Sequence, residues 1–335
     1  MCKKILILSA MIISVVSAMA SAVDKVTSER FSLYYIPTRT TSSVDSYVTE
    51  NDPPIVKSVS VTPAEPGPND PVIIIAVITN NPAYTTSKTL LAQIWYSKDD
   101  GATWTQKEMD QSDLSTDSWS VELPPFGASG KVRYYFTAKD DSGNYLVELP
   151  NLPVEWGGVE APKLSGNITD DDDDPRIVQS DLDILSVRMG YDGSMLYFSI
   201  RLDGDVSGGT VSPFNVNVYS AGIYYPDEIV PGRIRTDFVL EHSQHAQFLR
   251  FPVVGLLDTK EGLIEVRQAD ARYYSDDNWL YMRFKKDALK NKEFKSLRVI
   301  FGTGLATSHD PLIIVPEDTT GFVNIVSADR YYVVK

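Results

Sequence analysis

The chain carries five consecutive aspartates at residues 170–174, followed closely by Asp181 and Asp183. Calcium takes about six to eight oxygen ligands in flexible geometry, and carboxylates in an irregular loop can supply them. A divalent cation would also offset the mutual repulsion of these side chains. The pattern predicts a structural calcium site, with a solvated acidic linker as the alternative. The predicted ligands are Asp170, Asp172, Asp174, Asp181 and Asp183.

Aromatic residues in the C-terminal half indicate a second kind of chemistry, sugar binding. A pyranose ring packs its C–H groups against a flat aromatic face while its hydroxyls make hydrogen bonds. Side chains alternate between the two faces of a strand, so each of two adjacent tyrosine pairs is expected to expose one ring. Packing of the rings in the core or in cross-strand pairs is the alternative. The predicted sugar-binding residues are Tyr224, Tyr225, Tyr273, Tyr274 and Trp279.

No motif for catalysis stands out in the sequence. The chain has no Gly-x-Ser-x-Gly elbow, phosphate-binding loop, dinucleotide fingerprint or zinc-protease helix. Pairs of carboxylates for glycoside hydrolysis could be drawn from the 45 acidic residues, but a sequence by itself does not place any two of them at the required separation. We therefore expect a protein that is not an enzyme.

The charge balance argues against nucleic acid as a partner. The chain has 31 basic and 45 acidic residues, a formal net charge of −14. An acidic surface repels phosphate backbones and favours solubility, cation uptake or neutral ligands such as polysaccharide. The expected partners are a polysaccharide or glycan, or another cell-surface protein.

The first 22 residues have the pattern of a secretory signal peptide. Lys3 and Lys4 precede an apolar run, which ends in small residues around Ala20 and Ala22. Cleavage would remove Cys2, the single cysteine, so the mature chain would be free of disulfides, which is more typical of a bacterial or archaeal exported protein than of an animal one. No later stretch of about 18 apolar residues follows, and nothing else is expected to cross a membrane. The predicted location is secreted, periplasmic or on the cell surface.

Two β-sandwiches are predicted to position these residues. After a flexible leader at 23–52, short β-branched and aromatic runs separated by turn residues indicate seven strands in residues 53–154. A linker at 155–166 leads to about ten strands in residues 167–335, which favour a larger, jelly-roll-like antiparallel sandwich. One short helix is expected, at 286–293. The predicted fold class is all-β.

Both sandwiches resemble known families. The first resembles bacterial immunoglobulin-like or fibronectin type III-like modules at residues 95–97, 100–101, 104, 119 and 132–140. That resemblance implies a spacer or adhesive unit. The second resembles carbohydrate-binding module family 9-like, or DOMON-like, sandwiches. Its matching residues are 181–184, 191–193, 196–200, 203–205, 214–216 and 279–284. This resemblance implies a module that binds sugars or, in some branches, haem, although no methionine or histidine matches a haem ligand.

These observations together predict an exported, non-catalytic protein that recognises glycan at or outside the cell surface. A structural or adhesive surface protein that contacts other proteins is one alternative. An accessory subunit of a secreted hydrolase is another.

Overall fold

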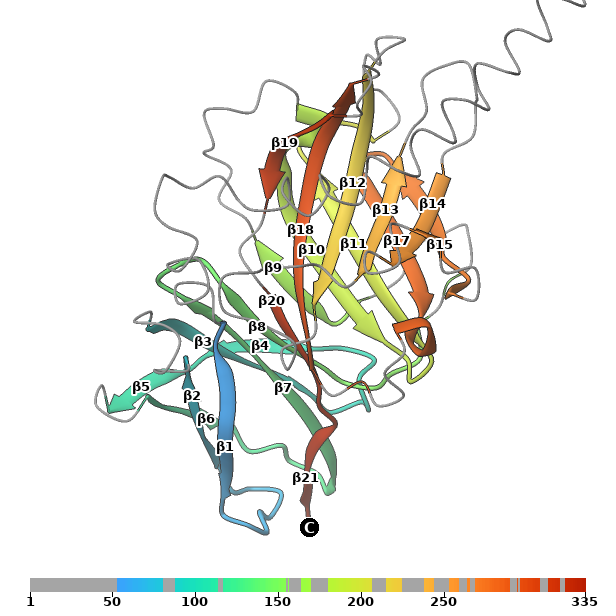
Figure 1. The fold of residues 1–335 in the computed structure, drawn as a ribbon. Helices are drawn as coiled ribbons and strands as arrows, with labels where there is room; N and C mark the ends of the chain where they lie inside the picture. The colour runs from blue at the N-terminus through green and yellow to red at the C-terminus, as the bar shows by residue number, and fades with distance from the viewer. Residues whose placement is uncertain are drawn as a thin grey trace, which may run out of the picture.

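The protein is all-β, as the sequence predicts. The computed structural model describes residues 53–80, 88–113, 117–154, 156, 164–169, 180–206, 215–224, 238–243, 253–258, 264–265, 269–289, 294, 296–307, 313–319 and 323–335. The predicted signal peptide and leader lie outside these residues. The described strands form two sandwiches, each with its own hydrophobic core (Figure 1).

The first sandwich packs a four-stranded sheet against the end of a larger, twelve-stranded sheet. The smaller sheet has the order β1 (Ile55–Thr62), β2 (Val72–Thr79), β6 (Ser118–Leu123) and β5 (Asp110–Asp113). Facing it are β4 (Thr105–Glu108), β3 (Thr89–Ser97), β7 (Gly130–Asp140) and β8 (Tyr145–Leu149). Side chains in β2 alternate, so Ile74 and Ile78 are buried while Ile73 and Ile75 point outward.

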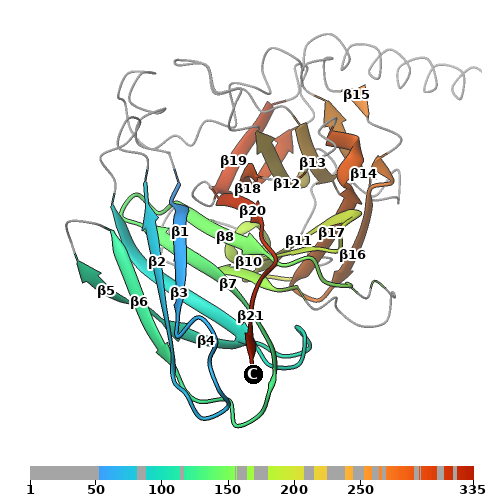
Figure 2. The same ribbon diagram turned by 90° about the horizontal axis from the view of Figure 1, so that it is seen from below.

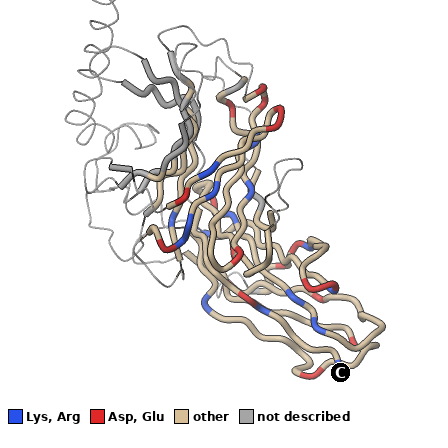
Figure 3. Tube along the Cα trace, turned by 90° about the vertical axis from the view of Figure 1, so that its right-hand side faces the viewer, with Lys and Arg blue, Asp and Glu red and all other residues tan. Residues whose placement is uncertain are grey.

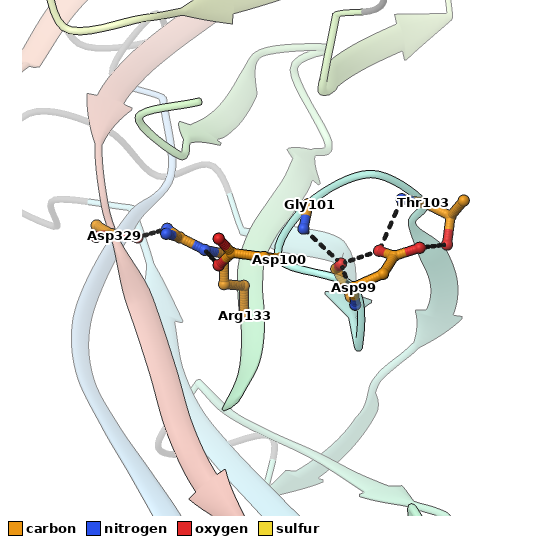
Figure 4. Close-up of polar contacts among 7 residues, drawn as sticks. Asp99, Asp100, Gly101, Thr103, Arg133 and Asp329 are labelled. Carbon is orange, nitrogen blue, oxygen red and sulfur yellow. Dashed lines mark hydrogen bonds and ion pairs between the residues drawn. The ribbon is translucent and has the colours of Figure 1, made fainter. Parts of the chain in front are cut away.

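Hydrogen bonds to the carboxylate of Asp99 stabilise the turn between β3 and β4 (Figure 4). This carboxylate accepts hydrogen bonds from the backbone N–H of Thr103 at 2.8 Å and from the Thr103 hydroxyl at 2.6 Å. These bonds from Thr103 lower the pKa of Asp99 to about 2. Gly101 has φ of 99°, and a Cβ there would lie 2.6 Å from a methyl carbon of Leu152. The turn therefore requires glycine.

The second sandwich also consists of two facing sheets. One has the order β16 (Arg272–Asp276), β17 (Trp279–Lys285), β11 (Met195–Leu202), β10 (Ile184–Tyr191) and β9 (Gly166–Thr169). The other continues the twelve-stranded sheet through β15 (Ile264–Glu265), β14 (Val253–Asp258), β13 (Phe238–Ser243), β12 (Asn215–Tyr224), β18 (Ser296–Thr307) and β20 (Val323–Ser327), with β19 (Ile313–Thr319) on β18. Short 3-10 turns occupy Ser180–Leu182 (η1) and Lys286–Leu289 (η4); the latter stands where a helix was predicted.

Strand β8 belongs to both cores. Tyr145, Val147 and Leu149 point into the core of the second sandwich, and Leu146 points into the core of the first. All five residues of β8 are buried, as expected for a strand covered on both faces. Strand β20 pairs with β8 in parallel and so carries the twelve-stranded sheet from one sandwich into the other.

The last strand, β21 (Arg330–Val334), returns to the first sandwich and pairs with β7 (Figures 1 and 2). Its Tyr332 and Val334 complete the core of that sandwich. The Arg330 guanidinium donates hydrogen bonds to both carboxylate oxygens of Glu148, which is buried in β8. Arg133 on β7 forms ion pairs with Asp100 in the hairpin and with Asp329 just before β21 (Figure 4).

The sequence had placed residues 53–154 in one sandwich, 155–166 in a linker and 167–335 in the other. Hydrogen-bonded strands cross these limits: β8 contributes to both cores, β9 begins at Gly166, and β21 lies in the first sandwich. Local alternation identifies a strand but carries no information on which distant strand pairs with it. The two sandwiches are therefore joined by a continuous sheet as well as by a connecting segment.

Candidate functional site: the outer face of the five-stranded sheet

The five-stranded sheet of the second sandwich has one apolar face and one face rich in arginine and aromatic residues. On β11, Leu196, Phe198, Ile200 and Leu202 point into the core, and on β17 so do Leu280, Met282 and Phe284. Alternation along a strand puts the remaining residues on the outer face. The outer-face residues of the three central strands include Arg188 on β10, Tyr197, Ser199 and Arg201 on β11, and Trp279, Tyr281 and Arg283 on β17. We call this set the arginine–aromatic face.

The strand register sets these residues side by side. The cross-strand pairs are Arg188 with Ser199, Ser199 with Tyr281, Tyr281 with Tyr274, Tyr197 with Arg283, and Arg201 with Trp279. Directly opposed residues in neighbouring strands have Cβ atoms about 4.5–5.5 Å apart. The register thus places Arg201 beside Trp279 and Arg283 beside Tyr197, so that arginine and aromatic side chains are neighbours on this face.

Trp279 is the centre of one group of contacts on this face. The Arg188 guanidinium lies 4.4 Å from the Trp279 ring centroid, and that of Arg201 lies 5.9 Å away. The Trp279 ring also stacks on Tyr281 at 5.8 Å with an interplanar angle of 18°. Tyr274 lies 5.9 Å from Tyr281 on the other side. A cation over an aromatic face is attracted to the ring quadrupole, so these rings hold the two arginines in place.

Trp156 is the centre of the second group, and it comes from the segment that connects the sandwiches. The Arg283 guanidinium lies 4.9 Å from its ring centroid, and Tyr197 lies 5.8 Å away. The Tyr197 hydroxyl donates a hydrogen bond to Asp192. Burial, reinforced by that carboxylate, raises the pKa of Tyr197 to about 12, so its hydroxyl stays protonated at neutral pH.

Charge compensation on this side of the sheet is incomplete. Asp270 forms ion pairs with Arg272 and Lys285 at 2.6 and 3.9 Å. Among the described residues, no carboxylate forms an ion pair with Arg188, Arg201 or Arg283. Arg188 and Arg201 are exposed. Figure 3 shows blue segments, which mark lysine and arginine positions, on neighbouring strands of the described chain.

Two buried polar atoms on the face lack a hydrogen-bond partner in the described part of the chain. They are Oγ of Ser199 and Nε of Arg283. Buried polar atoms in proteins are nearly always paired, so unpaired ones need an explanation. Both atoms lie in the second sandwich, and both belong to residues of the arginine–aromatic face. The outer layer of this sheet therefore has hydrogen-bonding capacity that its own described side chains do not use.

The predicted sugar-binding residues lie in different environments. Tyr273 packs against the core while Tyr274 lies on the outer face, so this doublet contributes one ring to each side of the sheet. Trp279 is half-buried, with Arg188 over its ring and Tyr281 stacked on it. Tyr224 ends β12, and its side chain is outside the described structure, as is all of Tyr225.

The predicted calcium ligands are mostly outside the described residues. This holds for Asp170, Asp172 and Asp174. Asp181 lies in η1, and Asp183 follows it and accepts a hydrogen bond at its backbone carbonyl from the N–H of Asp203. The described residues contain no group of three or more histidine, cysteine or acidic side chains suited to a metal ion. The calcium site stays a prediction.

Sequence reasoning missed Arg188, Arg201, Arg283 and Trp156. A signal was available, because each of the three arginines occupies an outward position in a strand whose inward positions are apolar. Arginine at outward positions of three adjacent strands indicates a basic face. Strand order is needed to see that these strands are adjacent, and local patterns do not supply it.

Comparison with known proteins gives no family. No protein-family model and no curated protein matches the chain. Similar solved structures include trypsin-activated alpha-2-macroglobulin from Escherichia coli, at 11% identity and TM-score 0.20 over 84% of this chain and 16% of that one. They also include the adhesin InvE of Yersinia pseudotuberculosis, at 9% identity and TM-score 0.17 over 80% of this chain and 58% of that one. The collagen adhesin of S. aureus is 6% identical with TM-score 0.17 over 86% of this chain and 96% of that one.

The chain thus spans 16% of the alpha-2-macroglobulin it matches and 58% of InvE. Similarities at these TM-scores carry no argument about function. The sandwich fold rests instead on the strands, registers and cores described above. The described part of the chain contains no helix with the length and apolar character that a membrane crossing requires.

Proposed function

We propose that this chain is an exported, non-catalytic adhesive protein that attaches to a partner at or outside the cell surface through its arginine–aromatic face. The observation that carries this proposal is the set of three arginines, held on aromatic rings, without carboxylate partners among the described residues. Export is inferred from the signal-peptide pattern of residues 1–22.

The geometry of the rings favours this function over stacking of a neutral sugar. A pyranose needs an open aromatic face. Tyr197 and Tyr281 are buried, and the half-buried Trp279 ring has the Arg188 guanidinium 4.4 Å from its centroid. What this surface offers to a partner is therefore mainly the N–H groups of arginine and the edges of rings.

The continuous sheet also supports an adhesive role. An adhesive protein transmits force from its binding face to the rest of the chain. Here β8 and β20 join the two cores by backbone hydrogen bonds, and the Arg330–Glu148 pair fixes the last strand to β8. Force on the second sandwich would therefore reach the first through paired strands.

Binding to an array of surface polymers tests the proposed function. The mature chain, residues 23–335, would be applied to immobilised polysaccharides and matrix proteins. We expect saturable binding to at least one polymer, and loss of it in Trp279→Ala, because Trp279 supports both Arg188 and Arg201. Tyr331→Ala, which removes an exposed ring of the first sandwich, is the control and should bind normally. A folded protein that binds nothing, or equal binding by both variants, contradicts the proposal.

A further inference from the structure

We propose that the partner of the arginine–aromatic face is an acidic polysaccharide, a polymer of sugars that carry carboxylate or sulfate groups. This inference rests on the proposed function and adds the chemical class of the ligand. It departs from the neutral glycan that the overall acidity of the chain suggests. The local charge on this face is the reason.

Charge complementarity is the first argument. The chain as a whole is acidic, yet Arg188, Arg201 and Arg283 lie on three adjacent strands. Three acidic groups near the face are Asp192, which accepts a hydrogen bond from the Tyr197 hydroxyl, Asp270, which is paired with Arg272 and Lys285, and the exposed Asp276 at the edge of the sheet. The exposed Asp203, Asp205 and Asp277 lie beyond the strand ends, where the N–H of Val206 donates to the Asp277 carbonyl. At the centre of the face the arginines are the predominant charge. An anion bound there is attracted by arginines that form no ion pair with a described carboxylate.

The geometry of the arginines is the second argument. A guanidinium presents a planar fork of N–H donors, which matches a carboxylate or a sulfate in two parallel hydrogen bonds. Contact with the Trp279 ring restrains Arg188 at 4.4 Å and, at the longer distance of 5.9 Å, Arg201, so less side-chain freedom is lost on binding. These two arginines are diagonal neighbours on β10 and β11, with Cα atoms about 7–8 Å apart. Successive anionic groups of one extended polymer could engage both.

The distribution of apolar surface favours a polysaccharide over an acidic protein. Stable protein interfaces have an apolar centre surrounded by a polar rim. The exposed large hydrophobic residues of the described structure all lie in the first sandwich; they are Ile73, Ile75, Leu90, Tyr331 and Val333. On the arginine–aromatic face Tyr197 and Tyr281 are buried, whereas Arg188 and Arg201 are exposed. That arrangement fits a polar, extended chain better than it fits a protein surface.

Charge density favours a polysaccharide over nucleic acid. Double-stranded DNA carries one negative charge per about 1.7 Å of its length, so a long segment would be repelled by the acidic remainder of the protein. A polymer with at most one or two charges per sugar experiences less of this repulsion. Its contacts with the arginines act at short range, within the Debye length of about 8–10 Å.

Polygalacturonate and dextran sulfate are suitable probes, with unsubstituted dextran as the neutral control and poly-glutamate as an acidic polypeptide. The test compares the intact mature chain with the R188Q/R201Q variant. The K57Q/K88Q variant removes the same number of positive charges from exposed positions in the first sandwich and is the matched control. Melting curves establish that all three proteins are folded.

We expect the mature chain to bind at least one acidic polysaccharide and not dextran, with affinity that falls as salt rises. R188Q/R201Q should weaken this binding about tenfold or more, because charge-assisted hydrogen bonds are lost, and K57Q/K88Q less than about twofold. Equal binding of dextran, preference for poly-glutamate, or equal effects of the two variants would overturn the inference. If the acidic polysaccharides fail while another polymer of the array binds, the inference fails and the adhesive function stands. If no polymer binds, both fail.

Discussion

Replacing Arg330 by alanine is expected to lower the free energy of unfolding by about 3–5 kcal/mol. The Glu148 side chain is 1% exposed, and its two oxygens accept hydrogen bonds from Arg330 Nε at 3.0–3.1 Å and from Nη2 at 2.7 Å. Without the guanidinium, a buried carboxylate would keep only the long contact at 3.3 Å from the Phe136 N–H. Leaving a buried charge uncompensated costs far more than an exposed ion pair contributes.

Lys335→Ala is the control for this prediction. Lys335 forms an ion pair with Glu65 at the same N–O distance, 2.7 Å, but the two side chains are 62% and 69% exposed. Its removal should cost about 0–1 kcal/mol. Denaturant unfolding of both variants measures the difference. Similar losses in the two variants would contradict the assignment of Glu148 and Arg330 as a stabilising connection between strands.

Ending the chain at Asp329 is expected to have a larger effect, which should be confined mainly to the first sandwich. The truncation removes Tyr332 and Val334 from that core, 6% and 2% exposed, together with the partner of Glu148. Burial of each such side chain is worth about 1.5–3 kcal/mol, so with the unpaired carboxylate the total exceeds about 5 kcal/mol. Stability of this order is most of what a typical domain has.

Hydrogen exchange measured segment by segment tests the truncation. Protection should fall sharply in β2, β3, β6 and β7, and persist in β10, β11 and β17, because the core of the second sandwich contains neither removed residue. Deleting Lys335 alone is the control and should leave both patterns intact. Unchanged protection in the first sandwich after truncation would show that β21 is dispensable there.

Much of the fold could be predicted from local pattern. Alternating apolar residues predict seven strands in residues 53–154, where the described chain forms eight, β1 to β8. Strand β5, at Asp110–Asp113, was missed because all four of its side chains are polar. The pairing of β21 with β7 was missed because about 200 residues separate the partners, and alternation does not encode distant partners.

The candidate site was predicted only in part. The alternation rule correctly separates Tyr273 from Tyr274, and Trp279 does lie on the outer face. The net charge of the whole chain does not reveal a local group of arginines. Binding of a charged ligand depends instead on the charges within about one Debye length of it. Trp156 was missed because its position over Tyr197 follows from the path of the connecting segment.

The most direct test of the account is to map which arginines a bound polymer protects. The mature chain would be labelled with an arginine-selective dicarbonyl reagent, with and without the acidic polysaccharide that it binds, and the modified peptides quantified by mass spectrometry. Arg188 and Arg201 are exposed, and we predict that the polymer protects both, while labelling of Arg330 in the first sandwich stays unchanged. Unchanged labelling of Arg188 and Arg201, or protection confined to the first sandwich, would contradict the assignment of the arginine–aromatic face as the binding surface.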